Sequence, residues 1–463
     1  ELTIPEVYNM GNASGIPLID EFNSVKEINS LYGIAEIAFK QNVFLNVTGR
    51  NDWSSTLPSN NNSYFYPSVG LSAIVTDILN IDNSVISYGK MRLSWAQVGN
   101  DTDPYRLNSS YNYGTLLQSV TVPGEIPNSN LKPEIASSYE VGTDLQFFNN
   151  RLGVDLTYYH MTSRNQIINV QVPITSGYTS KVLNAGEIKN QGVEFILRGT
   201  PVKSGDFSWD IMVNFAKNRS EVVELTEGID NYIVSSPGMG TVEARVGGRM
   251  GDIYGQKLMR SPDGDVIYKD GIPQVSPTIQ KLGNYNPDWM GGIYNTLKYK
   301  NIYLGFLFDT KQGGEIVSTT HAAGSESGIL PHTLPGRESG IVGDGVVDNG
   351  DGTFSPNTVN ISAPTYYRSK YHRTVTESHT FDASFIKLRE VKLGYKLPDA
   401  LLSSTLFRSA AFSIVARNLA LWSDVPHIDP ETTTIRGQTI IPGFEVTQLP
   451  STKSIGFNIN LTF

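Results

Sequence analysis

The clearest pattern in the chain is a two-residue alternation of apolar and polar side chains. In the segment 454–463, Ile, Phe and Leu occupy every second position, and Ser, Gly, Asn and Thr stand between them. Successive side chains of a strand point to opposite faces, so the pattern predicts a strand with one apolar face. The same pattern predicts thirteen strands, at about 28–40, 42–54, 64–78, 86–99, 136–148, 152–166, 189–200, 207–218, 288–299, 302–311, 384–397, 408–421 and 452–463.

The connections between these predicted strands alternate between short and long. Turns such as Asn149-Asn150 are very short, and a β-sandwich has no reason to gather its long loops at one end. Outer-membrane barrels have short periplasmic turns and long extracellular loops. We therefore predict an all-β transmembrane antiparallel β-barrel, because lipid admits spanning strands only where closure removes unpaired edges. The long loops are expected at about 100–135, 167–188, 219–287, 312–383 and 421–451.

The number of predicted strands is odd, whereas single-chain bacterial barrels have an even number. If the last strand ends at the periplasmic side, the first also runs inward, and residues 1–27 are the remnant of an extracellular loop. We therefore expect 28–463 to be the C-terminal portion of a larger barrel, with its C-terminus in the periplasm. No run of about 18 apolar residues occurs, so the sequence predicts no membrane-spanning helix.

Composition fits this fold and narrows the function. The chain combines strand formers (23 Tyr, 19 Phe and 5 Trp) with turn formers (43 Gly and 24 Pro). A net charge of −9 without clustered Lys or Arg argues against a nucleic-acid partner. The absence of cysteine excludes disulfides, thiolate nucleophiles and Cys-ligated zinc.

The sequence offers no catalytic or cofactor motif. Walker A, GxGxxG and GxSxG strings are absent, and no carboxylate pair has a glycosidase context, so we predict no enzymatic activity and no cofactor. The six histidines include no HExxH and no pair at i, i+4, so no zinc site is predicted. Asp344, Asp348 and Asp351 lie in a Gly-rich run that departs from the EF-hand spacing; calcium is a weak alternative there to an Asp/Gly turn cluster.

Short motifs follow one another in a fixed order over roughly residues 30–463. They are Asn46–Ser55, Tyr64–Val69, Lys90–Trp95 with Gly99–Asp101, Leu131–Glu134, Asn184–Gly186 with Asn190–Glu194, Phe207–Asp210, Asn286–Trp289, Ile386–Val391 and Ala416–Leu419. Each is weak alone. The ordered set resembles the barrel region of the SusC/RagA family of TonB-linked outer-membrane transporters, including its R-x-D-x-S-S and Y-P-S strings.

This resemblance implies a 22-stranded barrel that holds an N-terminal plug domain and a periplasmic segment that contacts TonB. No plug-like region precedes residue 28, so we expect the plug and the remaining strands to lie in a part of the protein absent from this sequence. The resemblance also implies a SusD-like surface lipoprotein as lid, and TonB-dependent import of oligosaccharides or peptides across the bacterial outer membrane. The final aromatic residue, Phe463, matches the barrel-assembly signal of such proteins.

Substrate contacts are expected in the long loops, because sugars stack on aromatic rings and form hydrogen bonds through their hydroxyls. The alternative for these rings is loop packing or contact with the lid protein. Two other functions stay open: a carbohydrate-binding or adhesive outer-membrane surface protein without active transport, and a soluble β-sandwich array. The candidate substrate-binding residues are Tyr111, Tyr113, Tyr366, Tyr367 and Trp422.

Overall fold

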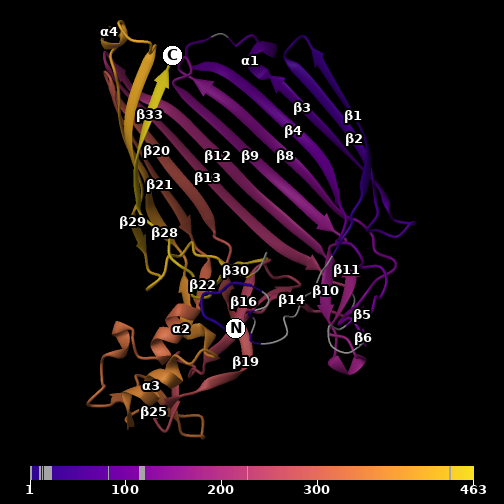
Figure 1. The fold of residues 1–463 in the computed structure, drawn as a ribbon, viewed down its shortest axis with the longest axis vertical. Coiled ribbons are helices and arrows are strands. Elements are labelled where there is room, and N and C mark those ends of the chain that lie inside the picture. Colours follow the sequence, from indigo (N-terminus) through magenta and orange to yellow (C-terminus); the bar gives the residue numbers. More distant parts are fainter. Residues whose placement is uncertain are drawn as a thin grey trace.

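The computed structural model contains one large antiparallel sheet, with smaller sheets and helices gathered at one of its ends (Figure 1). The structure describes residues 3–9, 12, 14, 23–81, 83–113, 120–226, 228–436 and 439–463. In this part of the chain the large sheet has thirteen strands, the number that the alternation predicted. They are β1 (Ile28–Phe39), β2 (Val43–Ser54), β3 (Ser63–Ile74), β4 (Ile86–Asn100), β8 (Glu134–Phe147), β9 (Leu152–Arg164), β12 (Glu187–Ser204), β13 (Phe207–Glu224), β20 (Trp289–Tyr299), β21 (Ile302–Gln312), β28 (Phe385–Lys396), β29 (Ser409–Ser423) and β33 (Ser454–Thr462).

The thirteen strands follow one another in chain order, and each pairs antiparallel with the next. Figure 1 shows that they form a curved wall. Among the described residues, β1 pairs only with β2 and β33 pairs only with β29, so the wall has two open edges. The all-β, antiparallel architecture predicted from the sequence is therefore confirmed.

Short turns join neighbouring strands at the end of the wall where the C-terminus lies (Figure 1). Between β8 and β9, three consecutive residues, Phe148, Asn149 and Asn150, have positive φ. Asn tolerates this left-handed conformation, which lets a hairpin reverse within a few residues. Two short helices, α1 (Val75–Ile78) and α4 (Asp399–Leu402), lie at the same end.

The connections at the opposite end are longer and fold into small structures of their own. Val242, Ile253, Val317 and Phe444 form one buried cluster, so segments from three different connections share a core. The elements of this end are β5 (Asn112–Tyr113), β6 (Val120–Thr121), β7 (Glu125–Ile126), β10 (Ile167–Gln171), η2 (Ile174–Ser176), β11 (Ser180–Asn184), β14 (Asn231–Ser235), β15 (Thr241–Arg245), β16 (Asp252–Leu258), β17 (Ile267–Lys269), β18 (Ile272–Pro273), β19 (Val275–Asn284), β22 (Glu315–Ser318), α2 (Thr319–Glu326), η3 (Pro331–Thr333), β23 (Ile341–Val342), β24 (Val346–Asp348), β25 (Phe354–Pro356), β26 (Asn360–Ile361), α3 (Ala363–Lys370), η4 (Thr376–His379), β27 (Thr380–Asp382), β30 (Thr434–Arg436), β31 (Thr439–Ile441) and β32 (Phe444–Glu445).

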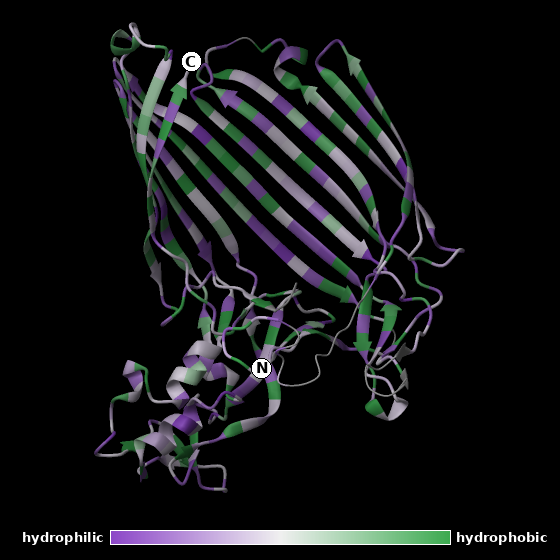
Figure 2. Cartoon of the chain, in the orientation of Figure 1, coloured by the Kyte–Doolittle hydropathy of each residue, from purple (hydrophilic) through white to green (hydrophobic). Residues whose placement is uncertain are grey.

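The wall has one apolar face and one polar face. The strand register places Leu156, Phe195 and Phe215 in one row across three strands. The adjacent row, on the opposite face, holds Thr157 and Glu194. Figure 2 shows the resulting alternation of hydrophobic and hydrophilic residues along the strands. Among the described helices, none combines the length and apolar content needed to cross a bilayer.

Three strands differ from their predicted bounds by more than three residues. The strand predicted at 64–78 ends at Ile74, because the chain continues as α1. The hairpin of β12 and β13 is longer than predicted, since its ladder continues to Glu187 and Glu224 at the loop end. Alternating polarity identifies the part of a strand with one apolar face; a ladder that continues into polar surroundings lacks that signal.

Candidate functional site

Charged side chains on the polar face pair with one another across neighbouring strands. Arg92 of β4 donates to Asp155 of β9 at 2.8 Å. Asp52 accepts from Arg50 at 2.7 Å and from the hydroxyl of Tyr66 at 2.6 Å. Ion pairs of this kind compensate charge on a hydrated surface, so much of the polar face is an ordinary polar wall.

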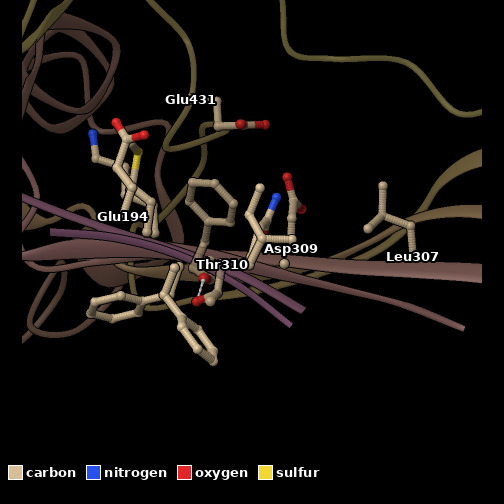
Figure 3. Close-up of a pocket in the computed structure, with 15 residues that line it drawn as sticks. Glu194, Leu307, Asp309, Thr310 and Glu431 are labelled. Carbon is tan, nitrogen blue, oxygen red and sulfur yellow. Dashed lines mark hydrogen bonds between the residues drawn. The ribbon is translucent and has the colours of Figure 1, made fainter. Parts of the chain in front are cut away.

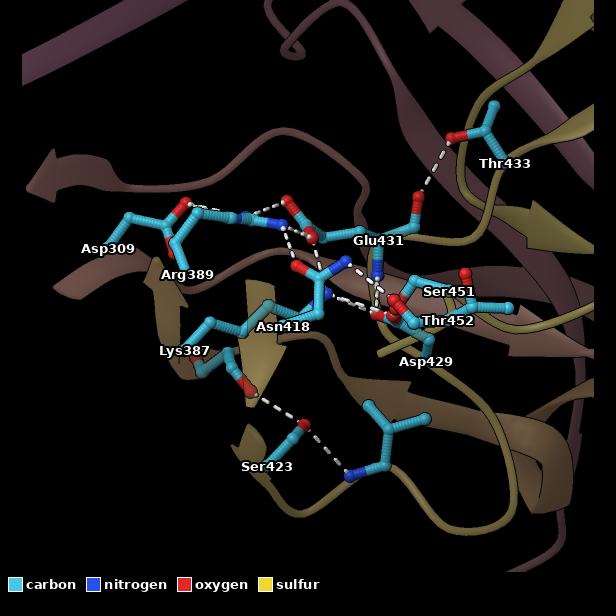
Figure 4. A network of polar contacts seen from close by, with 12 residues as sticks. Asp309, Lys387, Arg389, Asn418, Ser423, Asp429, Glu431, Thr433, Ser451 and Thr452 are labelled. Atoms are coloured by element: carbon cyan, nitrogen blue, oxygen red, sulfur yellow. Dashed lines mark hydrogen bonds and ion pairs between the residues drawn. The ribbon is translucent and has the colours of Figure 1, made fainter. Parts of the chain in front are cut away.

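A larger network lies where β21 and β28 meet the connection between β29 and β33 (Figure 4). Arg389 occupies an irregular position of β28, between Leu388 and Glu390, where the register with β29 shifts. Its Nε donates to Asp309 at 2.9 Å, and its two terminal nitrogens donate to the two oxygens of Glu431 at 2.8 and 2.7 Å. This two-pronged contact fixes the orientation of the guanidinium, which therefore bridges the wall and the last loop.

Lys387 anchors the same loop more deeply. Its ammonium group contacts both oxygens of Asp429, at 2.8 and 2.9 Å, and also donates to Glu431. Burial alone would raise the pKa of the Asp429 carboxyl, but hydrogen bonds from Lys387 and Ser451 outweigh it and hold that pKa below its usual value. Arg389 and Lys387 likewise lower the pKa of Glu431 against the opposing effect of its burial. These contacts hold residues 429–431 against the polar face.

A cavity of about 480 Å³ opens beside this network (Figure 3). The side chains of Glu194, Asp309 and Glu431 lie on the same side of the sheet in this view. Among the described residues, Oδ1 of Asp309 is one of four buried side-chain atoms without a hydrogen-bond partner. A buried acceptor without a donor is costly, so this oxygen is suited to receive a hydroxyl or amide N–H from a ligand. Asn214 and Lys311 also line the cavity.

The candidate residues Tyr366 and Tyr367 are not exposed platforms for a sugar. Both belong to α3, each is 8% exposed, and their rings meet edge to face at 5.3 Å. They form a buried cluster with Tyr268 and Ala363. Their packing, rather than ligand stacking, is what the structure assigns to them, because a buried face offers no surface to a sugar ring.

Trp422 also lies away from the polar face. The sequence predicted that the strand ends at 421, but β29 continues to Ser423, and Trp422 pairs with Ile386 in the apolar row. Its ring contacts that of Phe308, with centroids 6.4 Å apart. Trp422 therefore occupies the position of an interfacial aromatic residue. Tyr111 is exposed, and Tyr113 lies in β5, with its side chain outside the described part.

The carboxylates of the Gly-rich run make local turn contacts. Asp348 accepts from the backbone of Gly350 at 2.8 Å, and Asp351 accepts from the backbone of Thr353 at 3.0 Å. Within the described residues, they do not form a group with Asp344 that could share one ion. Phe463 packs its ring against Phe407, with centroids 5.1 Å apart, and remains 73% exposed.

The expectation that the histidines are scattered is wrong for four of them. One ligand atom of each of His321, His332 and His427 lies within 4.8 Å of the others. His379 contacts His321, with 2.9 Å between their Nδ1 atoms. No spacing rule could reveal this group, because its members come from segments up to about a hundred residues apart that only the loop fold brings together.

A curved antiparallel wall with an exposed apolar face, short turns at one end and folded loops at the other is typical of a transmembrane β-barrel. The apolar face then meets lipid, and the polar face lines the lumen. A family model described as "TonB dependent receptor-like, beta-barrel" matches residues 5–304. The chain belongs to this family, which places it in the outer membrane.

Several proteins of this class are similar to the chain. TonB-dependent receptor P3 of Formosa agariphila is 26% identical over 473 residues, which cover 94% of this chain and 46% of that protein. TonB-dependent receptor SusC of Bacteroides thetaiotaomicron is 27% identical over 215 residues, or 44% of this chain and 21% of SusC. The structure of the RagAB peptide transporter superposes with a TM-score of 0.77 at 21% identity, covering 99% of this chain and 50% of the other.

The chain spans about half the length of the first curated relatives that it matches, or less. The likeness to the RagAB structure concerns the fold, since the sequence identity is 21%. The resemblance to SusC/RagA-type transporters expected from the ordered motifs is confirmed by the family match and by the relatives named SusC and RagAB.

Proposed function

We propose that this chain forms the C-terminal part of a transporter that imports oligosaccharides or peptides across the outer membrane, with energy supplied through TonB. The observation that carries the proposal is the lumenal cavity beside the Arg389 network, on a wall that belongs to a TonB-dependent receptor family. The cavity combines unpaired and paired carboxylates with an amide and an ammonium group. Such a set suits ligands rich in hydroxyl or peptide groups, and it contains no arrangement of nucleophile and base.

The rest of the barrel and the plug would come from the part of the protein outside this sequence. The open edges β1 and β33 support this proposal, because an unpaired edge at membrane depth leaves backbone groups unsatisfied in lipid. Nine further strands between these edges would give the 22 strands implied by the resemblance. The plug would carry the segment that TonB pulls.

A SusD-like lipoprotein would cover the loop end, and the C-terminus would lie in the periplasm. The arrangement of the loops supports this orientation, since outer-membrane barrels carry their long connections on the outside. The three connections that share the cluster of Val242, Val317 and Phe444 would offer the lid one folded surface. A name and a title among the similar proteins, SusC and the RagAB peptide transporter, support the two substrate classes.

The test is uptake by cells that express the full-length receptor, with fluorescent oligosaccharides and peptides of graded length as probes. We expect internal fluorescence for at least one probe class, and its loss in a strain without TonB. In Asp309→Asn we expect uptake to fall about tenfold or more, the effect of weakening one charged hydrogen bond. Asp206→Asn, in an exposed turn at the opposite end, is the matched control and leaves uptake unchanged.

Surface binding that persists without TonB, with no probe inside the cell, would favour the adhesive alternative over transport. The amount of receptor in the outer membrane must be equal in all strains, so that a folding defect is not read as a transport defect.

A further inference from the structure

Three histidine rings meet at the loop end of the protein although they come from distant segments. His321 belongs to α2, His332 to η3, and His427 to the connection between β29 and β33. One ligand atom of each lies within 4.8 Å of the other two. Three nitrogens bound to one Zn²⁺ at about 2.0–2.1 Å are about 3.4 Å apart, so small ring rotations would close the group around an ion.

A chain of hydrogen bonds fixes which nitrogen of His321 is free. The Nε2 atom of His379 lies 3.1 Å from the carbonyl oxygen of Tyr371 and must therefore carry a proton. The Nδ1 atom of neutral His379 then accepts from Nδ1 of His321, at 2.9 Å. The lone pair of His321 is left on Nε2. A metal-binding histidine commonly donates its other N–H to such an acceptor, which orients the ring.

The same reasoning applies to His332. The hydroxyl of Ser325 donates its only proton to the carbonyl of His321 at 2.6 Å. The Nε2 atom of His332, at 3.1 Å from that hydroxyl oxygen, is therefore the donor. Its Nδ1 keeps a free lone pair. Two of the three rings are thus held in a defined tautomer by contacts outside the group.

The surroundings keep the rings neutral, as metal binding requires. His321 and His379 are 4% and 0% exposed, and the rings of Phe381 and Tyr371 pack around His321. Burial, with help from the neighbouring histidines, lowers the pKa of His321 to about 3. Burial also lowers the pKa of His379, to about 4. His427 is exposed, so the group opens to solvent on one side.

We propose that His321, His332 and His427 bind one divalent transition-metal ion, with Zn²⁺ the best match, and that His379 positions His321. Three imidazoles with an open fourth position suit Zn²⁺. The ion would join residues 313–384 to residues 424–453, and thereby fasten the loop that carries Glu431. This inference concerns a binding site and does not depend on the transport proposal.

The experiment is a Zn²⁺ titration of the chelator-stripped, full-length receptor in detergent against a chromophoric competitor. We expect one equivalent bound with a Kd below 1 μM, and tetrahedral absorption when Co²⁺ replaces Zn²⁺. His332→Ala and, independently, the exposed His427→Gln should each weaken binding at least a hundredfold. His379→Ala should weaken it about 10–100-fold, as expected for a residue that orients a ligand.

His372→Ala and His160→Ala are the controls and should bind like the wild type, since neither belongs to the three-histidine group. Zn²⁺ should also protect residues 424–453 from protease in the wild type and not in His427→Gln. The proposal is overturned if the wild type binds Zn²⁺ no more tightly than His427→Gln, or if the two control variants lose binding as well. Resistance of the barrel to unfolding in SDS verifies that each variant is folded.

Discussion

Lys387 carries a charge into the protein with 2% of its side chain exposed. Such a charge is tolerated only with good partners, and Asp429 and Glu431 supply them. Removing one partner leaves the other charge buried and alone, which costs more than the pair itself contributes. The residue therefore acts as a fastening point for the last loop.

We predict that Lys387→Met destabilises the receptor by about 3–5 kcal/mol, because Asp429 is left buried without its cation. Lys298→Met removes a pair with Asp210 that is 3.4 Å long and half exposed, and should cost about 1 kcal/mol or less. Urea unfolding in detergent measures both. Equal effects of the two substitutions would show that the buried contact has no special role.

The same contacts predict an acid limit. The pKa values of Asp429 and Glu431 are lowered in the folded protein, so the stabilisation is fully present above their unfolded values of about 3.9 and 4.3. It is lost as the pH falls through the lower, folded values. The stability difference between wild type and Lys387→Met should be constant from pH 7 to about pH 5 and shrink below about pH 4. A difference that shrinks already between pH 7 and pH 5 would contradict this.

Single residues were the hardest to assign from the sequence. Tyr366 and Tyr367 looked like loop aromatics available for stacking, but a loop with its own core buries them. The face of Trp422 depends on two more residues of strand β29. The histidine group depends on tertiary contacts alone. Local sequence carries the period of a strand, but not the folding of a long connection.

Strands were predicted far more successfully, because each one meets lipid on one side and water on the other. This division imposes a two-residue period along the whole of a strand. Packing between strands adds constraints that a period does not show. Gly99 of β4 faces the ring of Tyr64, which is buried with Leu57 and Leu131.

We predict that Gly99→Ala destabilises the sheet by about 1–3 kcal/mol, the usual cost of overpacking. The added Cβ would lie 2.4 Å from the Tyr64 ring, and that ring has no free space because its cluster holds it. Gly70→Ala, in the neighbouring β3, is the control, since its nearest neighbour would lie 4.0 Å away. The midpoint of thermal unfolding should fall for the first variant only. A similar fall for both would mean that glycine itself, and not the contact, matters.

At the scale of the whole molecule, the account predicts which end faces the outside. The chain contains no cysteine, so a single introduced thiol can be labelled selectively. Asp351→Cys, in an exposed loop turn, should react with a membrane-impermeant maleimide on intact cells. Asp206→Cys, in an exposed turn at the opposite end, should react only after the outer membrane is permeabilised. The reverse pattern would overturn the proposed orientation.

The open edges of the wall lead to the most direct measurement, a cryo-electron microscopy structure of the full-length receptor in lipid nanodiscs. The account predicts that the outer edges of β1 and β33 form backbone hydrogen bonds with strands from the part of the protein outside this sequence, and that one closed barrel surrounds a plug. A structure in which β1 pairs with β33, or in which both edges stay unpaired, would contradict it.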